Sequence, residues 1–298
     1  MTMKQTRQLK GAMVALVTPF RDGEVDWDAL GRLIDRQLAG GIQGLIPCGT
    51  TGESPTLSHE EHDAVIECTL QGAGGKVPVI AGTGSNSTAE AVRLTGHAKD
   101  AGADACLIVN PYYNKPTQQG LYEHVAEIAK VGLPIVLYNI PGRSGIRLEI
   151  DTIVRMYDEI EQVVAVKEAT GVVDNTSALA ARSDITIVSG DDSLTLPICA
   201  AGGVGVISVL ANILPAEIRA LTDAAAAGDL KAATRQHLKL FSLFKACFVE
   251  TNPIPIKAML SMVGMIANEL RLPLTPLSPR HRAPLAELLR PFGLEPKP

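Results

Sequence analysis

The sequence of 298 residues lacks the features that mark several specialised classes of protein. Its five cysteines form no Cys-x-x-Cys pair and mostly lie in apolar stretches, which is typical of buried, reduced thiols. Its longest apolar runs, such as residues 204–210, are far shorter than the roughly 20 residues of a membrane-spanning helix. Lysine and arginine total 27 against 32 aspartates and glutamates, and there is no long basic run, so nucleic acid is not an expected partner.

The first ten residues are polar and lack the apolar core of a secretory signal, so we expect a cytoplasmic protein.

Sequence signatures of metal and nucleotide sites are missing as well. His59 and His62 are three residues apart, but no His-Glu-x-x-His motif or nearby carboxylate set completes a zinc site. Gly82-Thr83-Gly84 has Ser87 where a dinucleotide fingerprint needs its third glycine, and no P-loop occurs. We expect neither a metal nor a cofactor.

Short runs rich in β-branched residues alternate with amphipathic segments through about the first 230 residues, which is the pattern of repeated βα units. The runs are almost continuously apolar, as strands covered on both faces are. Eight occur, at residues 12–18, 44–48, 77–82, 105–110, 134–140, 163–168, 185–190 and 204–210. Eight repeats favour a closed (β/α)8 TIM barrel over an open doubly wound sheet, although periodicity alone leaves both open.

The segments between the strands predict helices, among them residues 27–39, 58–71, 87–100 and 118–130. Ser58 followed by Glu61 predicts a capping box at the start of the second. After Gly228 the strand pattern stops, and prolines separate three predicted helices at residues 230–250, 254–270 and 280–289. The expected α/β organisation is a catalytic barrel over residues 1–228 followed by a C-terminal helical domain over residues 229–298.

Reactive residues at the carboxyl ends of barrel strands carry most weight, because active sites of such barrels lie there. Gly49-Thr50-Thr51-Gly52-Glu53 combines a tight turn, backbone N–H groups and hydroxyls suited to a carboxylate, although an ordinary capped turn has the same residues. Further along, Tyr112-Tyr113-Asn114-Lys115-Pro116 and Tyr138-Asn139-Ile140-Pro141-Gly142-Arg143 follow the fourth and fifth strands. There a tyrosine can move a proton and the arginine can bind a carboxylate, or the tyrosines can simply pack.

Lys167 ends the apolar strand Val163–Glu168. Burial at that position would lower the pKa of the amine and leave part of it free to attack a carbonyl, which is Schiff-base chemistry. The alternative is a lysine neutralised by a neighbouring carboxylate such as Glu168. Lys257 is the rival nucleophile, but it lies in the C-terminal helical segment and is interpreted as structural.

In this order and spacing, the segments Gly49–Glu53, Tyr112–Pro116, Tyr138–Arg143 and Lys167–Gly171 resemble the pyruvate-dependent Schiff-base aldolase family. The likeness covers about residues 10–292, and four motifs at strand ends make it specific. It implies an imine between Lys167 and pyruvate, formed without metal or cofactor. Arg143 favours the branch whose enamine attacks L-aspartate 4-semialdehyde, the first committed step toward diaminopimelate and lysine.

The resemblance also implies catalytic roles and an assembly. Thr50 and Tyr138 would form a proton relay that Tyr113 of a neighbouring subunit completes. A complete site would then need at least a dimer, and the family is usually a homotetramer built as a dimer of dimers.

The resemblance further implies how the substrates are bound. Thr51 would bind the carboxylate of pyruvate and Arg143 that of the semialdehyde, while Gly190 and Ile207 would line the pyruvate pocket. Two other functions stay open: an N-acetylneuraminate or 2-keto-3-deoxy sugar acid lyase, separated by the surroundings of Arg143, and a non-catalytic barrel that binds pyruvate or lysine. The set of lysine, tyrosines and threonine argues against the last.

Members of the family that lysine inhibits bind it at a subunit interface. The matching positions here are Ser54, His59, His62, Asn86, Glu90 and Tyr112. We therefore expect feedback inhibition by L-lysine, with Glu90 pairing with its ammonium group and Tyr112 transmitting the effect. Pro55 departs from the alanine common at its position, and a solvated helix face is the alternative interpretation of His59 and His62.

Overall fold

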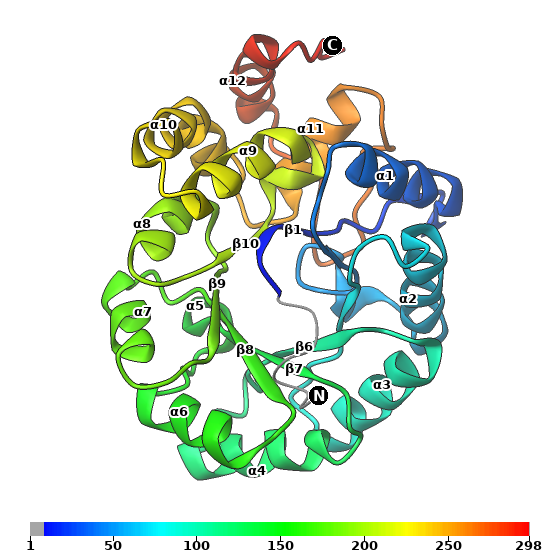
Figure 1. Cartoon of the computed structure of the whole chain (residues 1–298). Helices are drawn as coiled ribbons and strands as arrows, with labels where there is room; N and C mark the ends of the chain where they lie inside the picture. The colour runs from blue at the N-terminus through cyan, green and yellow to red at the C-terminus, as the bar shows by residue number, and fades with distance from the viewer. Residues whose placement is uncertain (1–8, 298) are drawn as a thin grey trace.

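The computed structural model describes residues 9–297. A ring of parallel strands lies at its centre, surrounded by helices (Figure 1). The ring strands are β1 (Gly11–Ala15), β4 (Leu45–Ile46), β5 (Ile80–Gly82), β6 (Ala105–Val109), β7 (Ile135–Asn139), β8 (Val163–Glu168), β9 (Thr186–Ser189) and β10 (Gly205–Ser208).

Hydrogen bonds join these strands in the order β4–β1–β10–β9–β8–β7–β6–β5. A bridge between Leu45 and Val79 closes the ring between β4 and the residue before β5. The predicted (β/α)8 barrel is confirmed. Each of its strands falls inside one of the eight predicted runs, except that β1 begins at Gly11, one residue before its predicted start. The chain also forms a small antiparallel hairpin of β2 (Phe20–Arg21) and β3 (Glu24–Val25), which was not predicted because strands of two residues carry no periodic pattern.

Helices follow the strands around the ring (Figure 1). All of them except the four-residue helix Pro141–Ser144 contribute apolar side chains to the core against the sheet. The capping box at Ser58 is confirmed: its hydroxyl accepts from the Glu61 amide at 3.1 Å, and the Glu61 carboxylate accepts from the Ser58 amide at 2.9 Å. The helices of the ring are α1 (Trp27–Ala39), α2 (His59–Ala73), α3 (Thr88–Ala101), α4 (Gln118–Ala129), α5 (Pro141–Ser144), α6 (Ile150–Glu159), α7 (Val173–Ala180), α8 (Thr195–Ala200) and α9 (Pro215–Ala226).

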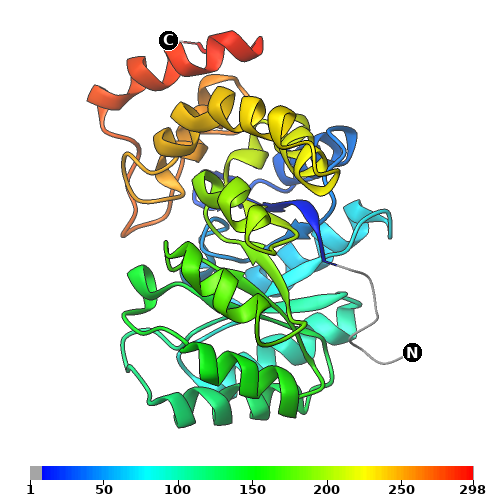
Figure 2. The ribbon, with the colours of Figure 1, turned by 60° about the vertical axis from the view of Figure 1, so that its left-hand side comes forward.

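Three further helices, α10 (Leu230–Ala246), α11 (Ile254–Met262) and α12 (Pro279–Leu289), gather at one side of the barrel (Figure 2). The prediction that the second of them extends to residue 270 was wrong. The helix ends at Met262, and Gly264 follows with a positive φ of 77°, which no helix accommodates. The division of the chain into two domains at residue 228 stays a prediction. Residues 1–8 of the predicted barrel domain lie outside the described residues. Within residues 9–297, no helix is long and apolar enough to cross a membrane.

Strand alternation decides which side chains face the barrel interior. The interior is filled by side chains from all around the ring, among them Met13, Ile46, Leu107, Tyr138 and Ile207. Ala165 of β8 belongs to this interior group, whereas its neighbour Val166 packs outward among the residues beneath the helices. Two residues further along β8, the next inward position is Lys167.

Candidate active site

The site forms around Lys167 at the carboxyl end of β8. Its side chain is 5% exposed, and it makes no hydrogen bond or ion pair with any described residue. Its Nζ atom lies 4.1 Å from the ring centre of Tyr138, which is the residue paired with it on β7. Burial lowers the pKa of Lys167 to about 7, although the negative charge of Asp192 acts in the opposite direction.

Glu168 does not neutralise this lysine. It points to the opposite face of β8, because successive side chains of a strand alternate. There its carboxylate accepts a hydrogen bond from the Thr170 amide at 2.9 Å, and burial raises its pKa. Glu168 is therefore not a carboxylate that neutralises Lys167, as the alternative interpretation of this lysine required.

Gly190 lies directly against the Lys167 side chain. A Cβ atom at this position would stand 2.7 Å from the Cβ of Ala169 and 3.1 Å from the Cε of Lys167. Real Cβ contacts are longer, so a side chain here would displace the lysine. Ile207, 1% exposed, contributes to the same interior from β10. The structure thus brings both predicted pocket residues to the barrel interior that holds the lysine.

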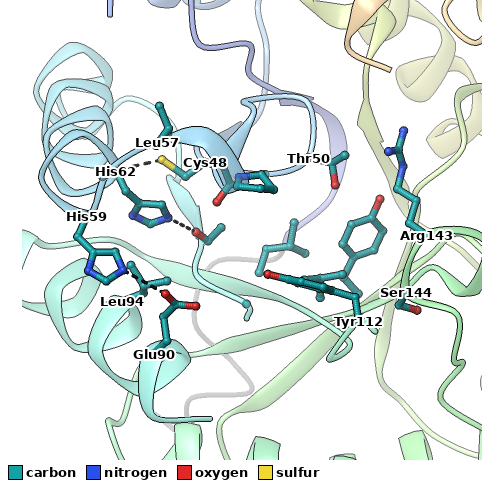
Figure 3. Close-up of a pocket in the computed structure, with 18 residues that line it drawn as sticks. Cys48, Thr50, Leu57, His59, His62, Glu90, Leu94, Tyr112, Arg143 and Ser144 are labelled. Atoms are coloured by element: carbon teal, nitrogen blue, oxygen red, sulfur yellow. Dashed lines mark hydrogen bonds and ion pairs between the residues drawn. The ribbon is translucent and has the colours of Figure 1, made fainter. Parts of the chain in front are cut away.

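Thr50, Tyr138 and Arg143 line a cavity of about 380 Å³ at this end of the barrel. Burial raises the pKa of Tyr138 to about 12, against smaller opposing effects of the Arg143 charge and the Thr50 hydroxyl. Tyr138 is therefore a neutral hydroxyl that can pass a proton on. Figure 3 shows Thr50, Arg143 and Ser144 at one end of the cavity and His59 and Glu90 at the other.

Thr51 is not among the cavity-lining residues, and it is 2% exposed. Its hydroxyl accepts a hydrogen bond at 2.9 Å from Nδ2 of Asn252, which lies just before α11. The main-chain carbonyl of Asn252 also accepts from a guanidinium nitrogen of Arg143 at 3.1 Å. Sequence reasoning missed Asn252, since it stands 201 residues from Thr51 and belongs to no recognised motif.

The turn Gly49–Glu53, which carries Thr51, is also held by an ion pair that was not predicted from the sequence. Glu53, at a positive φ of 53°, binds the Lys257 ammonium, and both side chains are fully buried. Lys257 also donates to the Thr18 carbonyl at 2.9 Å, and Arg271 donates its amide to the second Glu53 oxygen at 3.1 Å. The interpretation of Lys257 as structural agrees with this arrangement.

Tyr113 stands apart from the cavity of its own chain. It is 91% exposed and adopts a positive φ of 75°, an unusual conformation for a bulky residue. Its neighbour Tyr112 does line the cavity. The described chain thus presents the Tyr113 side chain outward and does not bring it to Lys167.

Five of the six positions matched to lysine binding line the cavity: Ser54, His59, His62, Glu90 and Tyr112. His59 and Glu90 lie together at one end of it, whereas Tyr112 lies toward Arg143 and Ser144 (Figure 3). His59 Nε2 lies 3.1 Å from Glu90 Oε1, and hydrogen bonds from Ser85 and His59 lower the pKa of that carboxyl. Asn86 lies outside the lining and donates to the Tyr112 carbonyl at 3.2 Å.

A solvated helix face describes the exposed His59 but not His62, which is 3% exposed and bonded through Nε2 to the Gly82 carbonyl at 2.9 Å. Residues 9–297 contain no group of three histidine, cysteine, aspartate or glutamate side chains arranged as metal ligands.

Comparison with known proteins gives a consistent result. The model of the dihydrodipicolinate synthetase family matches residues 8–291. The 4-hydroxy-tetrahydrodipicolinate synthase of Aquifex aeolicus (strain VF5) is 50% identical over 288 residues, which are 96% of this chain and 98% of that protein. A crystal structure of dihydrodipicolinate synthase from Aquifex aeolicus has a TM-score of 0.95 at 49% identity, over 97% of this chain and 100% of that one.

Two similar structures hold small molecules. The chloride-inhibited dihydrodipicolinate synthase from Acinetobacter baumannii, complexed with pyruvate, has a TM-score of 0.93 at 45% identity and covers 96% of this chain and 99% of its own. The enzyme from Cyanidioschyzon merolae with lysine bound has a TM-score of 0.93 at 38% identity, over 96% of this chain and 98% of that one.

Proposed function

Because the chain belongs to the dihydrodipicolinate synthetase family, we propose that it catalyses the 4-hydroxy-tetrahydrodipicolinate synthase reaction. In this reaction pyruvate, held as a Schiff base on Lys167, condenses with L-aspartate 4-semialdehyde. The observation that carries the proposal is the unpaired, buried amine of Lys167, whose pKa of about 7 leaves about half of it unprotonated at neutral pH. Since both substrates are metabolic intermediates, we place the reaction in the cytoplasm, as a step toward diaminopimelate and lysine.

The chemistry follows from that amine. Lys167 attacks the C2 carbonyl of pyruvate, and the carbonyl oxygen leaves as water to give the imine. Loss of a methyl proton converts the imine to an enamine, whose carbon attacks the aldehyde of the semialdehyde and forms the new carbon–carbon bond. The amino group of the semialdehyde then attacks the imine carbon, which closes the ring and releases Lys167 with its proton. Each step moves a proton, so a chain of hydroxyls beside the lysine is required.

Binding of the two carboxylates is assigned to Thr51 for pyruvate and Arg143 for the semialdehyde, with Gly190 and Ile207 lining the pyruvate pocket. Arg143 stands at the cavity and is exposed, so its guanidinium is accessible to an incoming anion. The pyruvate complex of the Acinetobacter baumannii relative supports pyruvate as the substrate held in this barrel.

The proton relay is assigned to Thr50 and Tyr138 of one subunit and Tyr113 of its neighbour. Support comes from the outward position of Tyr113, since a tyrosine that is 91% exposed beside a cavity-lining tyrosine is placed to enter another subunit. The proposed assembly is a homotetramer made of two dimers, in which the dimer completes the site.

Feedback inhibition by L-lysine is proposed at the part of the cavity that Glu90 and His59 line. The Glu90 carboxylate, whose pKa is lowered by its hydrogen bonds, would pair with an ammonium group of lysine, next to His59, His62, Ser54 and Tyr112, with Asn86 holding Tyr112. The lysine-bound relative supports this ligand. In the variant Glu90→Ala, the lysine concentration for half-inhibition should rise at least about tenfold, because a charge-assisted contact is lost. An unchanged value in an inhibition titration would move the site elsewhere.

The proposed function is tested by oxidation of NADPH in a coupled assay that contains pyruvate, L-aspartate 4-semialdehyde and the next reductase of the pathway. Turnover that requires both substrates is the expected result. If pyruvate is trapped on Lys167 by borohydride but no turnover occurs, the acceptor is another aldehyde, and sugar-acid substrates are tested next. If neither turnover nor adduct occurs, the proposal is wrong.

A further inference from the structure

Asn252 contacts two groups that follow different strands of the barrel. It lies just before α11, outside the barrel strands, and is 5% exposed. Its side-chain Nδ2 donates to the Thr51 hydroxyl at 2.9 Å, and its main-chain oxygen accepts from Arg143 at 3.1 Å. Thr51 follows β4 and Arg143 follows β7, so one residue of the C-terminal segment contacts both groups assigned to substrate carboxylates.

We propose that Asn252 is a positioning residue that fixes the direction in which the Thr51 hydroxyl donates. This inference rests on the proposed function, because it concerns the residue assigned to the pyruvate carboxylate. A threonine hydroxyl has one hydrogen and two acceptor lone pairs. Since an amide NH2 group can donate but cannot accept, Thr51 must use a lone pair toward Asn252, and its hydrogen is kept for another acceptor. A carboxylate of pyruvate is such an acceptor.

The other atom of the amide supports this assignment. Oδ1 of Asn252 is buried and has no hydrogen-bond partner among the described residues. If the amide were turned around, Oδ1 would accept the only hydrogen of Thr51 and none would be left for the substrate. An unpartnered buried acceptor is unfavourable. The orientation in which Nδ2 faces Thr51 is therefore the one that keeps the Thr51 hydrogen for the substrate, although it gives Oδ1 no partner among the described residues.

The two contacts of Asn252 can be separated by substitution, which makes the proposal testable. The contact to Arg143 uses the main-chain oxygen and survives any side-chain substitution, whereas the contact to Thr51 uses the side chain. A side-chain variant should therefore weaken the use of pyruvate and leave the use of the semialdehyde nearly unchanged. A residue that merely stabilised the fold would not separate the two substrates.

The experiment compares the variants Asn252→Asp and Asn252→Ala in the full-length enzyme. Asn252→Asp has nearly the same shape but takes the Thr51 hydrogen and adds a negative charge, so the KM for pyruvate should rise at least about tenfold. Asn252→Ala leaves the hydroxyl free to turn and should have a smaller effect in the same direction. In both, the KM for the semialdehyde should change by less than about twofold, and borohydride should still trap pyruvate on Lys167 at saturating concentration.

A double-mutant cycle with Thr51→Val isolates the contact. In that background, Asn252→Ala should add no further increase in the KM for pyruvate. Asn268→Asp is the matched control, because Asn268 in the C-terminal segment also has a buried Oδ1 without a partner among the described residues but forms no hydrogen bond with Thr51 or Arg143. Its KM for pyruvate should stay at the wild-type value.

Several results would overturn the inference. Equal changes in both KM values, an unchanged KM for pyruvate in both variants, or additive effects in the cycle would each show that Asn252 does not act through Thr51. Should Asn252→Asp fail to fold, the Asn252→Ala values and the cycle decide alone. If wild-type enzyme gives no adduct with pyruvate, the proposed function fails first and this inference fails with it.

Discussion

Two buried lysines, Lys167 in the barrel and Lys257 in the C-terminal helices, have opposite surroundings. They are 5% and 0% exposed, respectively. Lys257 binds the Glu53 carboxylate, donates to the Thr18 carbonyl and lies 4.3 Å from the ring centre of Phe20. Lys167 has an aromatic ring beside it and neither a carboxylate nor a carbonyl oxygen bonded to its nitrogen.

The difference shows that burial is not sufficient to make a reactive amine. Burial lowers the pKa of both lysines, but at Lys257 the charge of the adjacent Glu53 carboxylate and its hydrogen bond oppose this effect. At Lys167 the opposing carboxylate, Asp192, makes no ion pair with the amine and binds the Ser208 hydroxyl and the Val209 amide. A buried lysine that is bonded to no carboxylate can lose its proton near neutral pH, whereas an ion pair such as that of Lys257 with Glu53 favours the charged amine.

The largest expected effect is on the covalent adduct. Replacement Lys167→Ala should remove all borohydride-trapped pyruvate and lower turnover on the order of 10³-fold or more. Intact-mass measurement after reduction checks this, with Lys257→Met as the control that retains the adduct. An adduct that persists in Lys167→Ala and disappears in Lys257→Met would reverse the comparison.

The second prediction concerns Tyr113, which is proposed to act beside Lys167 of a neighbouring subunit. Tyr113→Phe removes a hydroxyl of the relay, and general acid–base groups typically contribute about 10²-fold or more to the rate. Each variant alone should be nearly inactive, but mixed oligomers of Tyr113→Phe with Lys167→Ala should recover part of the activity. Such oligomers contain sites with one intact copy of each residue. No recovery after mixing would place Tyr113 and Lys167 in the same subunit's site.

The third prediction concerns Lys257 and is an effect on stability. Lys257→Met leaves the buried Glu53 charge without its cationic partner, so the free energy of unfolding should fall by about 3–5 kcal/mol. The double variant Lys257→Met/Glu53→Gln should be much closer to wild type, because both charges are removed together. Denaturant unfolding at fixed protein concentration measures this. A single variant as stable as wild type would mean that the pair does not hold the turn.

The smallest effect is a shift along the pH scale. Because the attacking form is the free amine, the rate of adduct formation should rise with pH through a midpoint near 7. The Asp192 charge raises the pKa of Lys167, and the pKa of Asp192 itself is about 6, so it is mostly ionised at that midpoint. Asp192→Asn should therefore move the midpoint to lower pH. A shift to higher pH would contradict the electrostatic assignment.

Patterns along the chain predicted the barrel well, because each strand and helix carries its own local signal. The first helix and β8 have the predicted limits, residues 27–39 and 163–168, and the capping box predicted at Ser58 begins α2. The buried position of Lys167 was also predictable, since a lysine near the end of an apolar strand is expected to be buried. The absence of an ion pair between Lys167 and Glu168 follows from strand alternation, once β8 is known to be a strand.

Contacts between distant segments had no such signal. Asn252 and Thr51 are 201 residues apart, and Lys257 and Glu53 are 204 apart. Neither pair repeats a pattern that one sequence can reveal, because the partners meet only after the barrel has closed and the C-terminal helices have packed on it. The sequence therefore predicted where the reactive groups stand, but not what holds the turn that carries Thr51 and Glu53.

The close approach of Gly190 to Lys167 affects the conformational entropy of the lysine side chain. A free lysine side chain has about 2 kcal/mol of rotamer freedom to lose when it is ordered. The backbone of Gly190 approaches the stem of Lys167 so closely that even a methyl group has no room between them, and the ring of Tyr138 lies near its end. Most of that freedom is therefore lost when the chain folds, and pyruvate encounters an amine whose orientation is already restricted.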